Sequence, residues 1–128
     1  MRAPGFTLLE MVVVLAILGL ATALVAPAAL RGIDSWRRQS EIDALLDQVR
    51  AMPGDARAQG RAIVVSDAAL ASPKPPLRVS AEWRLSAPTP WQVSASGVCE
   101  GGEVRIGNDY GERRIVVSAP FCDPALQP

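Results

Sequence analysis

The longest apolar stretch of the chain runs from Met11 to Leu30 and contains no charged residue. Most of its 20 positions are Val, Leu, Ile, Ala or Met. At about 1.5 Å per residue, a helix over this stretch is about 30 Å long, which is the thickness of a bilayer hydrocarbon core. Because such a helix is apolar on all sides, we expect it to lie in lipid or among similar helices.

The pattern changes after Arg31. Apolar residues now recur at intervals of three and four, with charged residues between them, which predicts one apolar stripe on a soluble helix. The stripe comprises Ile33, Trp36, Ile42, Leu45, Leu46, Val49 and Met52. We therefore predict one long helix from Phe6 to about Ala51, with its first half in lipid and its second half packed on a globular part.

Two prolines interrupt this helix pattern. Proline in a helix interior costs about 3 kcal/mol, so Pro27 predicts either a kink or simply the end of the span. Pro53-Gly54 predicts the end of the soluble half. Asp55 to Gln59 then adds a further turn, which Gly60 stops.

Beyond Gly60 the pattern favours short strands. Strands are predicted at 61–65, at 77–85, where apolar and polar residues alternate, and at 91–94. A hairpin is predicted over 103–117, with its turn at Gly107–Gly111. Four to five short antiparallel strands after one long helix indicate an α+β fold, with the helix packed on a small antiparallel sheet.

Composition limits the chemistry. The chain has 128 residues, net charge zero, no histidine and two cysteines. We find no nucleophile elbow, catalytic triad, metal cluster or phosphate loop, so the prediction is a non-enzyme with no cofactor and no metal. Asp43 and Asp47 share a helix face but are best explained as solvated residues, and Asp109 and Asp123 are isolated. Neutral charge also argues against nucleic acid binding.

The two cysteines suggest an extracytoplasmic domain. A Cys99–Cys122 disulfide would tie down the C-terminal tail and requires an oxidising space such as the periplasm. The alternative is two unpaired, buried thiols.

The first ten residues carry a family resemblance. A short basic leader, Met1 to Gly5, is followed by Phe6-Thr7-Leu8-Leu9-Glu10 and then the apolar run. This arrangement resembles the N-terminus of type IV pilins and type II secretion pseudopilins. The resemblance implies that prepilin peptidase cleaves between Gly5 and Phe6 and that Phe6 becomes N-methylated. It also implies that Glu10, a costly charge near the membrane, pairs with the N-terminus of a neighbouring subunit during assembly.

The implied organisation has three parts: a leader at 1–5, a transmembrane and filament-core helix at 6–30, and a periplasmic pilin-like domain at 31–128. Two alternatives are an ordinary single-span anchor and a secretory signal peptide, for which Ala26-Pro27-Ala28 loosely imitates a cleavage site. The length of the apolar run, the position of Glu10 and the proline within the triplet all disfavour the signal peptide.

Within the family, the N-terminus and the Ala58–Val65 passage most resemble H-type minor pseudopilins. This implies a structural subunit at or near the tip of a periplasmic pseudopilus, anchored in the inner membrane before assembly, that helps export folded proteins across the outer membrane. Its implied partners are other minor and major pseudopilins, prepilin peptidase and the inner-membrane assembly platform. The alternative is a minor pilin of a type IV pilus, with Gly111–Arg114 contacting DNA phosphates during uptake.

Three tryptophans dominate the few aromatic residues. We expect Trp36 to dock the helix on the sheet, and Trp83 and Trp91 to lie in the core or to form an exposed contact for a partner.

Overall fold

The structure is a computed structural model and describes residues 4–128. Helix α1 (Leu8–Gln59) begins the fold, and the remaining elements are short. They follow in the order β1 (Ile63–Val65), α2 (Asp67–Leu70), β2 (Arg84–Ser86), β3 (Trp91–Val93), β4 (Gly102–Asn108), β5 (Gly111–Ser118) and β6 (Asp123–Gln127). The described chain forms two units that divide within α1: one ends at Gln39 and the other spans Ser40–Pro128.

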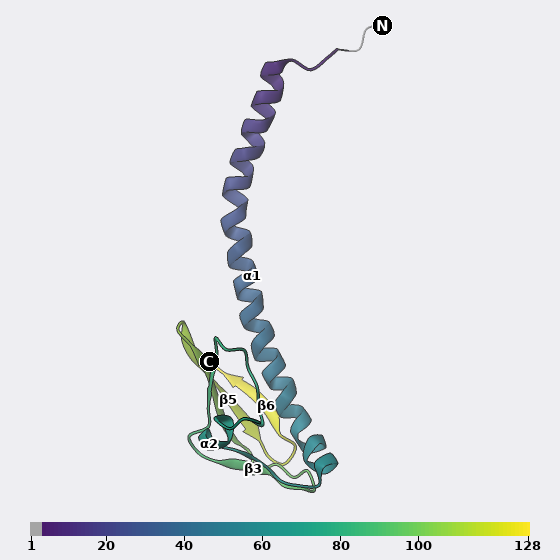
Figure 1. The fold of residues 1–128 in the computed structure, drawn as a ribbon, viewed down its shortest axis with the longest axis vertical. Coiled ribbons are helices and arrows are strands. Elements are labelled where there is room, and N and C mark those ends of the chain that lie inside the picture. The colour runs from purple at the N-terminus through teal and green to yellow at the C-terminus, as the bar shows by residue number, and fades with distance from the viewer. Residues whose placement is uncertain (1–3) are drawn as a thin grey trace. The chain divides into compact units, whose positions relative to one another are not determined.

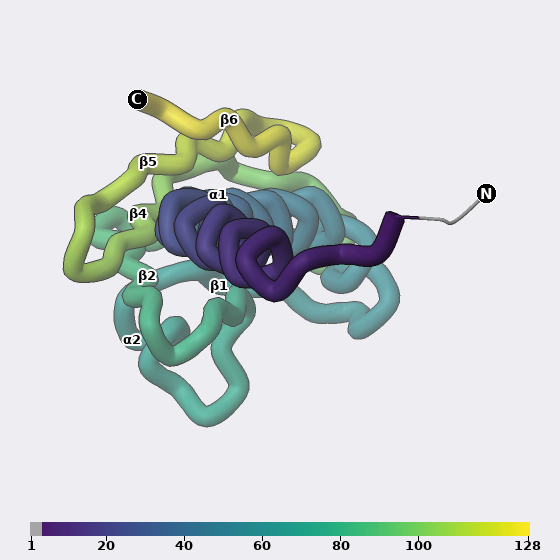
Figure 2. Tube along the Cα trace, turned by 90° about the horizontal axis from the view of Figure 1, so that it is seen from above, coloured from purple at the N-terminus to yellow at the C-terminus, as the bar shows by residue number. Residues whose placement is uncertain are grey.

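The strands of the second unit form two antiparallel sheets (Figure 1). The larger sheet has the order β2-β4-β5-β6, and its centre is the β4–β5 hairpin. The smaller sheet pairs β1 with β3, with Ile63 opposite Val93. Helix α2 lies beside β1 and β2 (Figure 2). The predicted strands at 61–65 and 91–94 and the predicted hairpin are therefore confirmed.

The core lies between the second half of α1 and the sheets. Five buried residues of α1 share one apolar cluster with the strands. They are Ile42, Leu45, Val49, Met52 and Ala56, and the strand residues include Val65, Trp91, Val93, Val104, Ile106, Ile115 and Val117. Removing this much apolar surface from water is the main stabilising term for the domain. The predicted fold class, α+β with a long helix packed on antiparallel strands, is confirmed.

The three tryptophans differ in burial, and one of them differs from our expectation. Trp91 is 3% exposed and belongs to the core, and Trp83 is half-buried against it. Trp36 is 72% exposed and is not among the core residues. The prediction that Trp36 docks the helix on the sheet is therefore wrong.

The end predicted for α1 near Ala51 is also wrong, because the helix continues through Pro53 to Gln59. Met52, Pro53 and Ala56 are all buried, so the apolar stripe extends past the proline. Burial on this face offsets the helix-breaking cost of about 3 kcal/mol. The stop at Gly60 is confirmed: its φ of 64° lies in the left-handed region that ends many helices.

Most of the strand predicted at 77–85 does not form. Only Arg84 and Leu85 of this stretch belong to a strand, β2. The backbone of Arg78 and Ser80 instead bonds to side chains of α1, and the Trp83 N–H donates to the Ser80 carbonyl in a turn. Backbone groups that are satisfied by helix side chains are not available for a ladder.

Two elements were not predicted. Strand β6 follows Cys122 directly and pairs with β5, with Ala125 opposite Val116. Its Pro124 is tolerated because β6 is an edge strand. Helix α2 is a single turn whose N-cap, Ser66, accepts a hydrogen bond from the Ala69 N–H.

Candidate functional site

The start of α1 is organised by Thr7. The Thr7 Oγ1 accepts a hydrogen bond from the Glu10 N–H at 3.2 Å, and the Thr7 carbonyl accepts one from the Met11 N–H at 3.2 Å. Thr7 is therefore the N-cap of the helix. This places Glu10 in the first turn, where the partial positive charge of the helix N-terminus favours a carboxylate.

The predicted cleavage site lies just before this cap. Gly5 and Phe6 are exposed and precede the helix in non-helical backbone. A peptidase needs an accessible, unwound peptide bond, and the Gly5–Phe6 bond meets that requirement. Residues 1–3 of the predicted leader, including Arg2, lie outside the described residues. Cleavage and methylation at Phe6 stay predictions.

The apolar run forms the next part of α1. This helix contains a window with a mean hydropathy of 2.6, and none of that window is buried within the chain. The helix is thus long and apolar enough to cross a membrane. The hydroxyl of Thr22 donates to the Leu18 carbonyl at 2.8 Å, so this polar group is satisfied inside the helix. Pro27 lies within the continuous helix, and the predicted kink there stays a prediction.

The unit Ser40–Pro128, called the globular unit below, is cross-linked by a disulfide between Cys99 and Cys122, whose Cα atoms are 5.4 Å apart. Both residues are buried, and the Cys99 N–H also donates to the Pro120 carbonyl at 2.9 Å. The bridge joins the segment before β4 to the residue before β6. It thereby fixes the last strand against the hairpin, as the sequence predicted for the tail.

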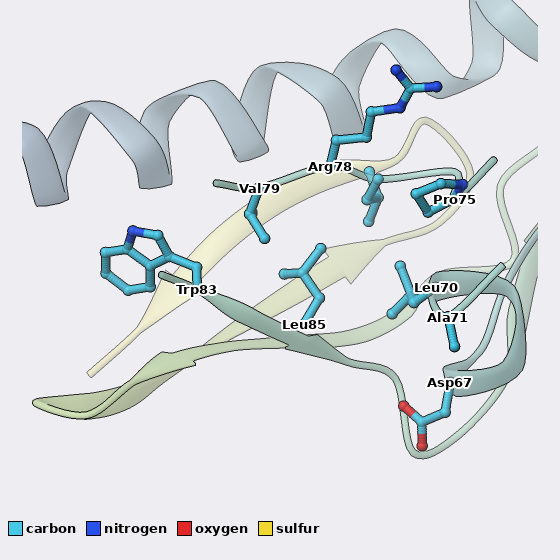
Figure 3. A pocket seen from close by; sticks show the side chains of 9 residues that line it. Asp67, Leu70, Ala71, Pro75, Arg78, Val79, Trp83 and Leu85 are labelled. Carbon is cyan, nitrogen blue, oxygen red and sulfur yellow. The ribbon is translucent and has the colours of Figure 1, made fainter. Parts of the chain in front are cut away.

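An open groove of about 590 Å³ lies on one side of the globular unit (Figure 3). Seven of its nine lining residues are of apolar type; the nine are Asp67, Leu70, Ala71, Pro75, Leu77, Arg78, Val79, Trp83 and Leu85. Trp83 thus forms part of a surface that a partner can contact. The groove borders β2, an edge strand of the larger sheet.

Three side chains hold the walls of this groove, and we did not identify any of them from the sequence. Gln48 bonds to the backbone of Arg78, Glu41 bonds to the backbone and hydroxyl of Ser80, and the Asp67 carboxylate accepts from the Ala87 N–H at 2.7 Å. The N-cap pattern Ser66-Asp67 is a local indication of α2. Nothing local in the sequence distinguishes Gln48 or Glu41 from the other polar residues of α1.

The proposed DNA-contacting residues lie on β5. Arg113 and Arg114 are adjacent on the strand, so their side chains point to opposite faces of the sheet. On one face, Glu103 pairs with Arg105 at 2.8 Å and with Arg114 at 3.8 Å. The hydrogen bond to Glu103 and its negative charge raise the pKa of Arg105 above its ordinary value. Glu103 therefore offsets part of the positive charge of the two arginines on this face.

Within residues 4–128, no group of three His, Cys, Asp or Glu side chains is arranged to hold a metal ion.

Residues 1–26 match the family described as the prokaryotic N-terminal methylation motif. The match covers the predicted leader, the predicted cleavage site, Glu10 and most of the apolar run, and it supports a type IV pilin-like structural subunit. Together with the long apolar helix, it fits a membrane-anchored protein that faces the periplasm. No curated protein and no solved structure matches the chain.

Proposed function

We propose that this chain is a minor pseudopilin of a type II secretion system, assembling at or near the tip of the pseudopilus to help drive export of folded periplasmic proteins across the outer membrane. The observation that carries the proposal is the N-terminal methylation motif at residues 1–26, continuous with an apolar helix that leads into a small α+β domain. The disulfide supports a periplasmic location for that domain.

Processing comes first in this proposal. Prepilin peptidase cleaves the exposed Gly5–Phe6 bond and methylates the new amino group of Phe6. The chain then waits in the inner membrane as a single-pass protein. Its 31–128 domain lies in the periplasm, where it can meet other minor and major pseudopilins and the assembly platform.

Glu10 drives the transfer from membrane to filament. A carboxylate near the membrane is costly, and Glu10 has no cation within the first turn of its own helix. In a staggered array of parallel helices, the amino group of a neighbour's Phe6 neutralises it. The apolar run then packs on copies of itself instead of on lipid.

The alternative function is a minor pilin of a type IV pilus that captures DNA. The net charge of zero does not favour it, and Glu103 offsets part of the positive charge of Arg105 and Arg114 on β4 and β5, whereas nucleic acid binding relies on unneutralised cations. We therefore retain the secretion role.

Intact-mass analysis of the protein from its native host tests the processing. The expected mass begins at a methylated Phe6 and rises by two hydrogens on reduction of the disulfide. A mass that begins near Ala29 would instead identify an ordinary exported domain.

Deleting the gene for this protein from its native host tests whether the protein serves a type II secretion system or a type IV pilus. We expect secreted proteins to accumulate, folded, in the periplasm, while surface pili and DNA uptake persist. Normal secretion with loss of pili would overturn the secretion role and favour the type IV pilus.

A further inference from the structure

The segment that follows the apolar run, residues 31–38, combines cations with exposed apolar side chains. It contains Arg31, Ile33, Asp34, Trp36, Arg37 and Arg38. All of these belong to α1 and to the unit that ends at Gln39. Trp36 is 72% exposed and Ile33 is 48% exposed. A large exposed indole on a helix calls for a partner, because it holds much apolar surface in water.

The position of Trp36 along α1 indicates which layer of a membrane would surround its side chain. Trp36 lies six residues beyond Leu30, which is about 9 Å along a helix. The headgroup layer on each side of a bilayer is about 5–8 Å thick. Side chains on a helix lean toward its N-terminus, so the ring returns toward the membrane by part of a turn. With the apolar run in the hydrocarbon core, the indole lies among the headgroups.

The position of Glu10, near the other end of the apolar run, supports the same depth of α1 in the bilayer. Glu10 and Trp36 are 26 residues apart, or about 39 Å along the axis. A bilayer with both headgroup layers is about 40–45 Å thick. The carboxylate and the indole therefore reach opposite interfaces at the same time, without stretching or thinning the bilayer.

The chemistry of the segment suits this layer. Indole has an apolar body and one N–H donor, which is why tryptophan is enriched at membrane interfaces. Arg31 lies one residue beyond the apolar run, and its long stem can follow the helix while the guanidinium reaches a lipid phosphate. With three arginines and one aspartate, the segment is net positive, which favours a surface of phosphates.

We propose that Trp36 is a lipid-facing anchor, seated in the headgroup layer at the periplasmic surface, that sets the depth of α1 before assembly. This inference rests on the proposed membrane location of the apolar run. It assigns Trp36 a partner, phospholipid headgroups, that differs from the protein core expected for it from the sequence.

Depth-dependent fluorescence quenching tests the proposal. The full chain is reconstituted into vesicles of phosphatidylethanolamine and phosphatidylglycerol that carry a spin-label quencher at the headgroup, near the glycerol or near the acyl-chain end. Subtracting the signal of a Trp36→Phe variant removes the contribution of Trp83 and Trp91. As a matched probe of the membrane centre, Leu20→Trp is placed in the Trp36→Phe background.

We expect Trp36 to be quenched most by the headgroup and glycerol labels, and the tryptophan at position 20 to be quenched most by the acyl-chain-end label. If position 20 is quenched but Trp36 responds only to aqueous iodide, the anchor is overturned while the membrane location stands. Protection of Trp36 from both lipid labels and iodide would also overturn it, and would indicate burial against another protein chain. If position 20 is not quenched by any lipid label, the membrane location itself fails.

Discussion

The side-chain amide of Gln48 makes two hydrogen bonds with the backbone of Arg78. Its Nε2 donates to the Arg78 carbonyl at 2.7 Å, and its Oε1 accepts from the Arg78 N–H at 2.8 Å. The amide thus serves both backbone groups of one residue, as a neighbouring strand would. Seven residues earlier on α1, Glu41 accepts from the Ser80 N–H at 2.6 Å. The segment around Arg78 is therefore attached to the helix rather than to a sheet.

Replacing Gln48 tests this attachment. Gln48→Ala removes two hydrogen bonds of about 1 kcal/mol each, and exposure to water recovers part of the loss. We expect the free energy of unfolding to fall by about 1–2 kcal/mol, measured by urea denaturation of the full chain in detergent. Gln59→Ala, on the same helix, loses only a local bond to Arg61 and should change it by less than about 0.5 kcal/mol. Equal effects of the two substitutions would contradict the attachment.

Gly102 lies directly against the ring of the buried Trp91. A Cβ at position 102 would overlap Cδ1 and Cγ of the indole and lie 2.9 Å from the Trp91 Cβ. Because the ring is in the core, we expect Gly102→Ala to destabilise the domain by about 1–3 kcal/mol. The same urea denaturation measures the loss, with tryptophan fluorescence as the readout.

Gly54 provides the matched control. It lies inside α1, and nothing is within 4 Å of a Cβ built there. Gly54→Ala should therefore stabilise the chain by about 0.5–1 kcal/mol, since alanine has the higher helix propensity. A stable Gly102→Ala variant would mean that Trp91 does not pack on Gly102.

The disulfide should be a major source of stability. It closes a loop with a sequence separation of 23 residues, for which loop-closure entropy predicts about 3 kcal/mol. We expect the double variant Cys99→Ala/Cys122→Ala to lose about this amount of unfolding free energy. Reductant should destabilise the natural chain to a similar extent and leave the double variant unaffected. A response of the double variant to reductant would show that the bridge is not the cause.

Glu10→Ala tests the assembly step. Hydrogen bonds to charged groups contribute about 1.5–3 kcal/mol, so we expect incorporation into filaments to fall by roughly tenfold or more. Insertion into the inner membrane should be unchanged, as measured by membrane fractionation beside quantification of sheared filaments. Glu82→Ala, which removes an exposed carboxylate from the globular unit, should assemble normally. Unchanged incorporation of the Glu10→Ala variant into filaments would contradict the pairing of Glu10 with the Phe6 amino group of a neighbouring subunit.

Some features follow from the sequence because their causes are local. An uncharged run of 20 residues forms a helix that is long enough to span the hydrocarbon core of a bilayer, whatever the rest of the chain does. The hairpin at Asn108–Gly111 follows from turn residues between alternating strands. With only two cysteines, the sequence left either a Cys99–Cys122 bridge or two unpaired thiols, and the structure shows the bridge.

Other features depend on distant residues, and only the tertiary structure decided them. The alternation at 77–85 is typical of a strand, but Gln48 and Glu41 bond to its backbone groups at Arg78 and Ser80 from 30 and 39 residues away. Pro53 stays helical because the residues around it are buried in a core that the strands complete. Strand β6 forms because β5 presents an edge to it, not because its own sequence favours a strand. In each case the free energy of long-range contacts exceeds the local preference that the sequence displays.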